Sequence, residues 1–304
     1  MKQGEHTVTH GHAPRVAVLR AADRAGALAS ALSAAGAVPV LCPLIDHELP
    51  AGSELATART ALQRLASGAY AWVVFTSVTA VRAAVELSAS ADPDSADLDG
   101  ADPTSAVLDI AQGTRVAAVG QATARAVRAL GAGVDLVPGG EHSARGLVAE
   151  FPAVIDTGAA TVLLPAADLA APTLADGLVE RGWRPERVSV YRTVDAPADP
   201  SRALSVPVPG ALPVPSGAQR LEPSALAEQL AAGALDAAVL TSPSTARRVV
   251  DLLAGRPSRT GYLALGPRTA AEATDLGLDV IATAPSTDPS GLAAALAAAT
   301  ERTS

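Results

Sequence analysis

The feature that most constrains the fold of this chain is an internal repeat, because a sequence unit that occurs twice is expected to fold the same way twice. Residues 69–87, AYAWVVFTSVTAVRAAVEL, contain a short β-branched and aromatic run from Trp72 to Phe75, which predicts a strand, and continue with apolar residues at helical spacing. Thr76 and Ser77 stand between the two parts, where helix N-caps are found. Residues 235–253, LDAAVLTSPSTARRVVDLL, repeat this order and place Ser242 at the equivalent position. The chain therefore contains a unit of strand, hydroxyl cap and helix twice.

The repeat continues in register beyond these units. Residues 115–138 and 262–285 both follow the order strand, Gly-x-x-Thr, helix, Gly, strand, Pro. Each copy then closes with a helix that contains a Gly-Leu pair, near Ser143 in the first copy and near Pro289 in the second. Strands that alternate with helices in this way predict parallel sheets. We therefore expect an α/β fold of two related parallel-sheet domains.

The segments around the repeat predict how the two domains are connected. Residues 43–49 and 188–195 contain runs in which apolar and polar residues alternate, as is typical of half-exposed strands. We interpret them as a two-stranded linker, so that one domain is inserted in the other and an interdomain cleft lies between them. The predicted boundaries are a disordered tail at 1–13, domain 1 at 14–42 and 196–302, linker strands at 43–49 and 188–195, and domain 2 at 50–187 with a surface insertion at 88–113.

Two polar segments and the amino-terminal tail carry no predicted element. Residues 88–113 are acidic and broken by prolines, and residues 199–222 are rich in Pro, Gly and Ser, so we interpret both as loops. The tail contains three histidines, which could bind a metal, but a disordered terminus explains them better.

Composition argues against several functional classes. Cys42 is the only cysteine, which excludes an internal disulfide and a CxxC redox pair. The net charge of −8 argues against general binding to nucleic acid or anionic membranes. Lys2 is the only lysine, which sets aside a Schiff-base mechanism. Because no stretch is long and apolar enough to span a membrane and no apolar signal core opens the chain, we expect a soluble cytoplasmic protein.

Helix N-termini carry the strongest candidate binding residues. The chain contains no HExxH, no Walker A motif, no GxGxxG after a strand and no GxSxG elbow. What remains are hydroxyl-bearing residues near four helix starts, two in each half: Ser77, Thr123, Ser242 with Ser244, and Thr269. A helix N-terminus offers free N–H groups and about half a positive charge. These residues suit a ligand with several carboxylates or phosphates, although each hydroxyl can equally be a structural cap.

Three further places offer chemistry. Arg20 follows the first strand and can reach the same edge of the sheet or lie solvated at the surface. Tyr191 stands on an alternating run, where its phenol can donate a hydrogen bond, act as a weak acid, or simply pack. Asp46, His47 and Glu48 could act as acid or base, although polar residues on an exposed strand need no catalytic explanation.

At these residues the chain resembles the uroporphyrinogen-III synthase family. The likeness runs from about residue 15 to the last helix, minus the two insertions, and is carried by Arg20, VVFTSVTAVRA at 73–83, AVGQATARA at 118–126, VSVYRT at 188–193, LTSPST at 240–245 and LGPRTAAEA at 265–273. The resemblance implies two α/β domains joined by a two-stranded ladder. It also implies an enzyme that cyclises the linear tetrapyrrole hydroxymethylbilane to uroporphyrinogen III, with inversion of ring D and loss of water, in haem or cobalamin biosynthesis.

The resemblance also implies residue roles and partners. Ser77, Thr123, Ser242 and Thr269 become substrate-binding residues, and Tyr191 becomes the best catalytic candidate. The activity is that of a hydro-lyase and needs no metal or organic cofactor. We further expect a monomer that takes its substrate from hydroxymethylbilane synthase as a transient partner and binds neither nucleic acid nor membrane.

Two other functional classes compete with this interpretation. A two-lobed binding protein or sensor for a small polyanionic ligand is the main alternative, because twin α/β domains with capped helices serve that purpose equally well. A nucleotide-sugar transferase is disfavoured, because no acidic DxD motif stands at a predicted strand end.

Overall fold

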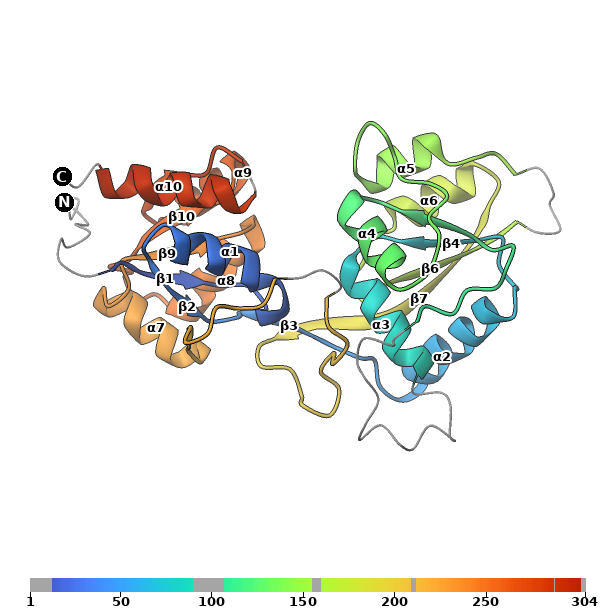
Figure 1. The fold of residues 1–304 in the computed structure, drawn as a ribbon, viewed down its shortest axis with the longest axis horizontal. Coiled ribbons are helices and arrows are strands. Elements are labelled where there is room, and N and C mark those ends of the chain that lie inside the picture. Colours follow the sequence, from blue (N-terminus) through green and yellow to red (C-terminus); the bar gives the residue numbers. More distant parts are fainter. Residues whose placement is uncertain (1–12, 90–106, 155–159, 209–211, 287, 302–304) are drawn as a thin grey trace. The chain divides into compact units, whose positions relative to one another are not determined.

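The computed structural model describes residues 13–89, 107–154, 160–208, 212–286 and 288–301. Contacts divide the chain into two compact units. Unit 1 comprises Met1–Asp46, Asp195–Pro197 and Ala211–Ser304, and unit 2 comprises His47–Val194 and Ala198–Gly210. Each unit is built around one sheet with helices packed on it (Figure 1), so the predicted α/β fold class is confirmed. No helix in the described part of the chain is long and apolar enough to cross a membrane.

Unit 1 contains a six-stranded sheet in the order β11-β10-β9-β1-β2-β8, in which every neighbouring pair is parallel. Its strands are β1 (Arg15–Val18), β2 (Val38–Leu41), β8 (Gln219–Arg220), β9 (Ala237–Leu240), β10 (Gly261–Ala264) and β11 (Val280–Thr283). Its helices are α1 (Ala22–Ala34), α7 (Pro223–Ala232), α8 (Pro243–Leu253), α9 (Pro267–Asp275) and α10 (Pro289–Glu301).

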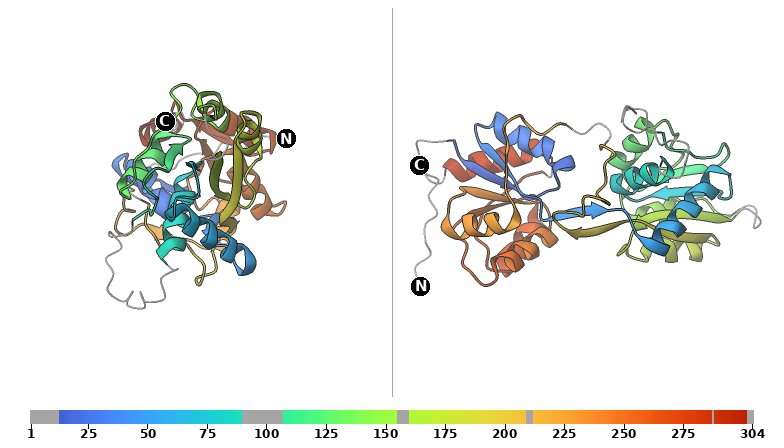
Figure 2. Two further views of the ribbon diagram at one scale, coloured as in Figure 1. Left: turned by 90° about the vertical axis from the view of Figure 1, so that its right-hand side faces the viewer. Right: turned by 90° about the horizontal axis from the view of Figure 1, so that it is seen from below.

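Alternating side chains of β1 show how this sheet is buried on both faces. Val16 and Val18 pack with α1 and α10 on one face, while Ala17 and Leu19 pack with α7, α8 and α9 on the other. The helices on both faces are seen in Figure 2. Burying one Leu or Val side chain in such a layer contributes about 1.5–3 kcal/mol. This two-sided burial explains why the strands read as continuous apolar runs.

Unit 2 contains a five-stranded sheet in the order β3-β7-β6-β4-β5. Its strands are β3 (Ile45–Glu48), β4 (Trp72–Phe75), β5 (Arg115–Ala118), β6 (Thr161–Ala167) and β7 (Arg184–Asp195). Its helices are α2 (Gly52–Ala66), α3 (Val78–Ala89), α4 (Gln121–Ala129), α5 (Ala144–Glu150) and α6 (Thr173–Glu180). The pairs β4–β5, β4–β6 and β6–β7 are parallel.

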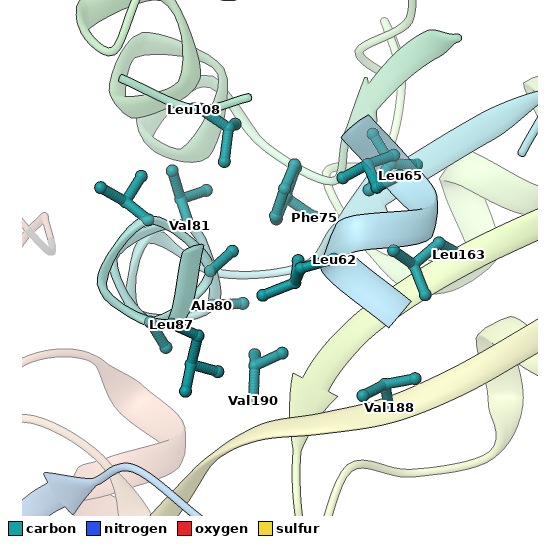
Figure 3. Packing of buried hydrophobic residues seen from close by; sticks show 14 of the residues in the cluster. Leu62, Leu65, Phe75, Ala80, Val81, Leu87, Leu108, Leu163, Val188 and Val190 are labelled. Atoms are coloured by element: carbon teal, nitrogen blue, oxygen red, sulfur yellow. The ribbon is translucent and has the colours of Figure 1, made fainter. Parts of the chain in front are cut away.

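The strand β4 divides the core of unit 2 into two clusters. Val73 and Phe75 point to the side of α2, α3 and α4, where the cluster of Figure 3 lies. Trp72 and Val74 point to the side of α5 and α6, where Trp72 packs against Phe151 with ring centroids 4.9 Å apart. Few aromatic residues are available to this chain, so the remaining core volume is filled mainly by Ala, Val and Leu.

The two units are related by circular permutation, which extends the repeat seen in the sequence. In unit 2 the order α2-β4-α3-β5-α4-α5 precedes β6-α6-β7, whereas in unit 1 the equivalent α7-β9-α8-β10-α9-β11-α10 follows β1-α1-β2. Equivalent strands take equivalent places, because β4 lies between β5 and β6 just as β9 lies between β10 and β1. The prediction of two related halves is therefore confirmed.

One predicted strand differs between the copies. The repeat predicts a strand before each Pro that ends it, at residues 134–138 and again before Pro285. Unit 1 has β11 there, but unit 2 has only an isolated parallel bridge between Ala117 and Leu136. The first copy thus forms one bridge and no full strand at this sheet edge, where β5 is the only strand beside it among the described residues.

The predicted insertions and tail have different outcomes. The amino-terminal histidines and most of the 88–113 insertion lie outside the described residues. The prediction that 199–222 is a plain loop is wrong in part. Residues 198–208 belong to unit 2, and Leu204 and Val206 pack against its core. Residues 219–220 form β8 in unit 1.

Gly146 and Gly291 are the third residues of the equivalent helices α5 and α10, where the preceding loop closes against the helix backbone. A Cβ on Gly146 would lie 1.9 Å from the carbonyl oxygen of Glu141, and one on Gly291 would lie 2.3 Å from that of Ser286. We expect Gly146→Ala to lower the free energy of unfolding by roughly 1–3 kcal/mol, because the loop must move away. Thermal unfolding measures this, with Gly133→Ala as the control, since a Cβ there meets nothing within 4 Å. Equal melting temperatures for the two variants would contradict the prediction.

Candidate functional site

Tyr191 lies in unit 2 at the point where β7 passes the end of β6. Its register partner is Ala167, and the pairing shifts by one residue just before it. Such an irregularity re-aims the following side chain. As a result Tyr191 joins Val188 and Val190 in the cluster beneath α2 and α3, whereas strict alternation would have turned it to the opposite face. Tyr191 is only 9% exposed.

The hydroxyl of Tyr191 meets the start of helix α3. Its oxygen lies 3.3 Å from the Oγ of Ser77, and either group can be the donor. The Ser77 Oγ also accepts a hydrogen bond of 3.0 Å from the backbone N–H of Ala80. Ser77 therefore caps the helix, as predicted, and also contacts the catalytic candidate. Two motifs that are 114 residues apart in the sequence thus come together.

His47 contacts Tyr191 from strand β3. The two rings form an edge-to-face pair with centroids 5.3 Å apart and planes at 73°. His47 and the next residue, Glu48, are buried, with 5% and 6% of their surface exposed. The interpretation of these two residues as polar groups on an exposed strand is therefore wrong, because a later segment of the chain covers them. Asp46 stays partly exposed.

The Glu48 carboxylate is held by structural partners. One oxygen accepts a hydrogen bond of 2.6 Å from the backbone N–H of Asp199, and the other lies 2.9 Å from the guanidinium of Arg202. These contacts occupy both oxygens, so Glu48 serves the fold of unit 2 and is a poor candidate for an acid or base.

A cavity of about 400 Å³ opens at the carboxyl ends of β4 and β6 in unit 2. Thr76 lines it, directly before Ser77. The starts of α5 and α6 contribute Ser143, Arg145 and Thr173. The hydroxyl groups and the guanidinium can hold a carboxylate through charge-assisted hydrogen bonds, whereas Glu141, which also lines the cavity, would repel one. The sequence motifs predicted this sheet edge, but they did not single out Arg145 or Thr173.

The loops around this cavity are fixed by neighbouring side chains. The Glu150 carboxylate accepts hydrogen bonds from the backbone N–H groups of Gly139 and Gly140, at 3.0 Å and 3.3 Å. These bonds lower the pKa of Glu150 below its ordinary value, because they favour the charged form. On the other side, the Arg187 guanidinium donates a bond of 2.6 Å to the carbonyl of Ala170. The cavity therefore has a preformed rim.

Thr123 and Thr269 do not cap their helices. Each is the third residue of its helix, and the N-cap positions are Gly120 and Gly266, which have no side chain. Both threonines are buried, at 5% and 4% exposure. In the Gly-x-x-Thr motif the glycine is thus the cap and the threonine is part of the first turn, which corrects the interpretation of these residues as hydroxyl caps.

The start of α8 in unit 1 is equivalent to the start of α3 in unit 2, and it carries a cluster of hydroxyls. Ser242 is the N-cap, and its Oγ accepts a bond of 3.3 Å from the Thr245 N–H. The same Oγ lies 2.9 Å from the Ser244 Oγ. Ser244 is exposed, so its hydroxyl can also reach a ligand. Arg20 follows β1 in the same unit and is partly buried.

The described residues contain no group of three or more His, Cys, Asp or Glu side chains that could hold a metal ion. Unit 2 offers a buried phenol paired with the Ser77 hydroxyl. It also offers a cavity with a polar rim, which Thr76, the residue before Ser77, helps to line. This arrangement can donate a hydrogen bond to a leaving oxygen and hold carboxylates.

Comparisons with known proteins agree on one family. The model of the family described as uroporphyrinogen-III synthase HemD matches residues 26–294. A mutant uroporphyrinogen III synthase from the extremely thermophilic bacterium Thermus thermophilus has a similar structure, with a TM-score of 0.55 and 20% sequence identity over 95% of this chain and 100% of that one. The uroporphyrinogen-III synthetase of Helicobacter pylori aligns with a TM-score of 0.51 and 14% identity over 94% of this chain and 99% of that one. A search of curated protein sequences finds no significant match.

Proposed function

The chain belongs to the uroporphyrinogen-III synthase family, and from this premise we propose that it is a hydro-lyase that closes hydroxymethylbilane to uroporphyrinogen III with loss of one water. The observation that carries the chemical part of the proposal is the contact between the buried Tyr191 hydroxyl and Ser77 at the start of α3. The family match supports this synthase function and not the alternative of a two-lobed binding protein.

The reaction sets a geometric task more than a chemical one. The terminal hydroxyl of the bilane leaves as water and gives an azafulvene. The last ring then attacks through its substituted carbon, passes through a spiro intermediate, fragments and recloses inverted. Holding the reacting carbons together and blocking direct closure can be worth several kcal/mol, about the value of a well-oriented intramolecular reaction.

Tyr191 has the chemistry for the first step. A phenol donates a hydrogen bond without adding a charge to the site. Its burial removes competing water, and Ser77 together with the His47 ring fixes its direction. We propose that this hydroxyl donates to the departing oxygen and so assists its loss as water.

The carboxylate arms of the substrate would be held by hydroxyls, guanidinium groups and helix N-termini. In unit 2 the cavity lined by Ser143, Arg145 and Thr173 supports this role. In unit 1 the exposed hydroxyls at the start of α8 support it, since an N-terminus favours an anion. We propose substrate contacts for the buried Thr123 and Thr269 on the family resemblance, and for Arg20 and Ser244 on their places after β1 and at the start of α8.

Ser242 allows capping and substrate binding to be separated. Ser242→Ala should lower the free energy of unfolding by about 1 kcal/mol and raise KM a few-fold with kcat unchanged. Ser242→Asp should keep the cap and the stability, because Asp caps as well as Ser, but raise KM about tenfold by repelling a carboxylate. Steady-state kinetics and thermal unfolding of both variants measure these effects. A wild-type KM for Ser242→Asp would leave Ser242 with a structural role only.

The whole proposal is tested by product analysis. The purified chain is incubated with freshly made hydroxymethylbilane, and the oxidised products are separated by chromatography. We expect the type III isomer in excess over the type I isomer that forms without enzyme. A product mixture equal to that of the enzyme-free control would overturn the proposed function.

A further inference from the structure

Residues 198–206, called the clasp from here on, run along the free edge of β3 in unit 2. The Leu49 N–H donates to the Arg202 carbonyl at 2.8 Å, and the Leu204 N–H donates to the His47 carbonyl at 3.4 Å. Between them Glu48 and Ala203 form an antiparallel bridge. The clasp therefore extends the sheet beside the strand that carries His47.

A half-buried ion pair fastens the first half of the clasp. The Glu48 side chain is 7% exposed and lies 2.9 Å from the Arg202 guanidinium. Its other oxygen accepts from the Asp199 N–H at 2.6 Å. Asp199 in turn accepts from Ser201 and Arg202, and these bonds lower the pKa of its carboxyl. A buried carboxylate with these partners holds its segment in one geometry.

The second half of the clasp is fastened to helix α3. The Glu86 carboxylate accepts bonds from the Ser205 N–H at 2.9 Å, the Ser205 hydroxyl at 2.7 Å and the Val206 N–H at 3.2 Å. The buried Arg82 donates from its Nε to the Val206 carbonyl at 2.6 Å. Glu86 and Arg82 lie one helical turn apart, and both therefore hold Val206, while Glu86 also holds Ser205.

The contacts of the clasp and those of Tyr191 link strand β3 to helix α3 by two separate routes. Tyr191 touches His47 on β3 and Ser77 at the start of α3. The clasp joins β3 to α3 by an independent route, through Glu48 at one end and Glu86 at the other. Elements linked by two routes cannot shift against each other without breaking bonds on both.

We propose that the clasp is a positioning element, in which Glu86, Arg82 and Arg202 hold β3 and α3 so that His47 and Ser77 fix the Tyr191 hydroxyl. The kinetic part rests on the proposed function, because it assumes that this hydroxyl acts in the reaction. The structural part, that release of the clasp loosens Tyr191, stands independently of activity. A displacement of about 1 Å at a catalytic group can cost up to about a hundredfold in rate.

The structural part is tested by fluorine NMR on the full chain labelled with fluorotyrosine. The chain has three tyrosines, so Tyr191→Phe assigns one signal, and Tyr70 and Tyr262 serve as internal references. Glu86→Ala removes the grip on Ser205 while Ala keeps helix α3 intact. We expect the Tyr191 signal to shift or broaden and the other two to stay. The control is Arg181→Ala, which removes a hydrogen bond from the Arg181 guanidinium to the Phe151 carbonyl. This bond involves neither the clasp nor Tyr191, so the control should leave the Tyr191 signal unchanged.

The kinetic part is tested by a double-mutant cycle. Glu86→Ala should lower kcat about fivefold to tenfold with KM within about twofold, an effect smaller than loss of the hydroxyl itself. In the Tyr191→Phe background the same change should have almost no further effect on kcat, because two changes that act through the same hydroxyl are not additive. Arg202→Ala should behave like Glu86→Ala, and Arg202→Lys should recover part of the rate by keeping a charge near Glu48.

The outcomes separate the two proposals. If the Tyr191 signal does not respond to Glu86→Ala or Arg202→Ala in folded protein, the clasp proposal is wrong whatever Tyr191 does. If Glu86→Ala lowers kcat equally in both backgrounds, the clasp does not act through Tyr191 and the proposal is also wrong. If the signal responds but Tyr191→Phe keeps the wild-type kcat, the proposed role of Tyr191 fails while the structural part of the clasp proposal holds.

Discussion

The thiol of Cys42 is expected to react with a thiol reagent at least about a thousandfold more slowly in the native chain than in denaturant. Cys42 is fully buried directly after β2, and it packs in the core formed with α7, α8 and α9. Burial, with the nearby Glu222 carboxylate, raises its pKa to about 12. At pH 8 the reactive thiolate is then about a thousandfold rarer than in the unfolded chain, where the pKa of the thiol is 9.0.

The same shift predicts how the stability of unit 1 depends on pH. The folded state keeps the proton of Cys42 up to about pH 12, whereas the unfolded chain loses it near pH 9.0. The contribution of Cys42 to stability is therefore constant below about pH 9, and above it this contribution falls by about 1.4 kcal/mol per pH unit. Tyr262 adds to this loss above pH 10, because burial raises its pKa to about 12.

Both effects are measured on the unlabelled chain, which has no other cysteine. The rate of thiol labelling is followed with and without denaturant, and denaturant unfolding is repeated from pH 7 to pH 10.5. Cys42→Ser is no clean control, because a buried hydroxyl needs a partner, so Cys42→Ala serves for the pH series. Rapid labelling of native protein, or a stability that does not fall above pH 9, would contradict the burial of this thiol.

The sequence predicted the elements whose signals are local. Strand β4 begins and ends at the predicted residues, Trp72 and Phe75, because four apolar residues between polar neighbours suit a strand buried on both faces. The Ser77 cap was predictable for the same reason, since its hydrogen bond to Ala80 spans three residues. Gly-x-x-Thr is also local, yet its threonine was misinterpreted, because hydroxyls at the cap and in the first turn look alike in a sequence.

What the sequence did not predict depends on contacts between distant segments. His47 and Glu48 read as an exposed alternating strand, and only the segment around Asp199, 151 residues away, shows that they are buried. The direction of Tyr191 depends on a register shift against β6 that no pattern in β7 reveals. The site was therefore predictable as a set of helix starts at one sheet edge, but not as a group of touching side chains.

Tyr191→Phe is expected to lower kcat by about a hundredfold with KM little changed. The substitution keeps the ring, so its edge-to-face contact with His47 and its packing in the core of unit 2 remain. It removes only the hydroxyl that meets Ser77. Loss of one positioned proton donor typically costs about 10² to 10⁴ in rate, and the lower end is expected because helix starts and the cavity still bind the substrate.

The control is Tyr262→Phe, which removes the hydroxyl of another buried tyrosine. In unit 1 this hydroxyl donates a hydrogen bond of 2.8 Å to the Ser258 hydroxyl. It should lower stability modestly and leave kcat unchanged. Because ring inversion depends on how the bilane is held, the product of Tyr191→Phe should still be the type III isomer, formed more slowly. Single-turnover kinetics and isomer analysis of both variants check this. If Tyr191→Phe turns over at the wild-type rate, Tyr191 is only a packing residue, and binding geometry alone accounts for the catalysis.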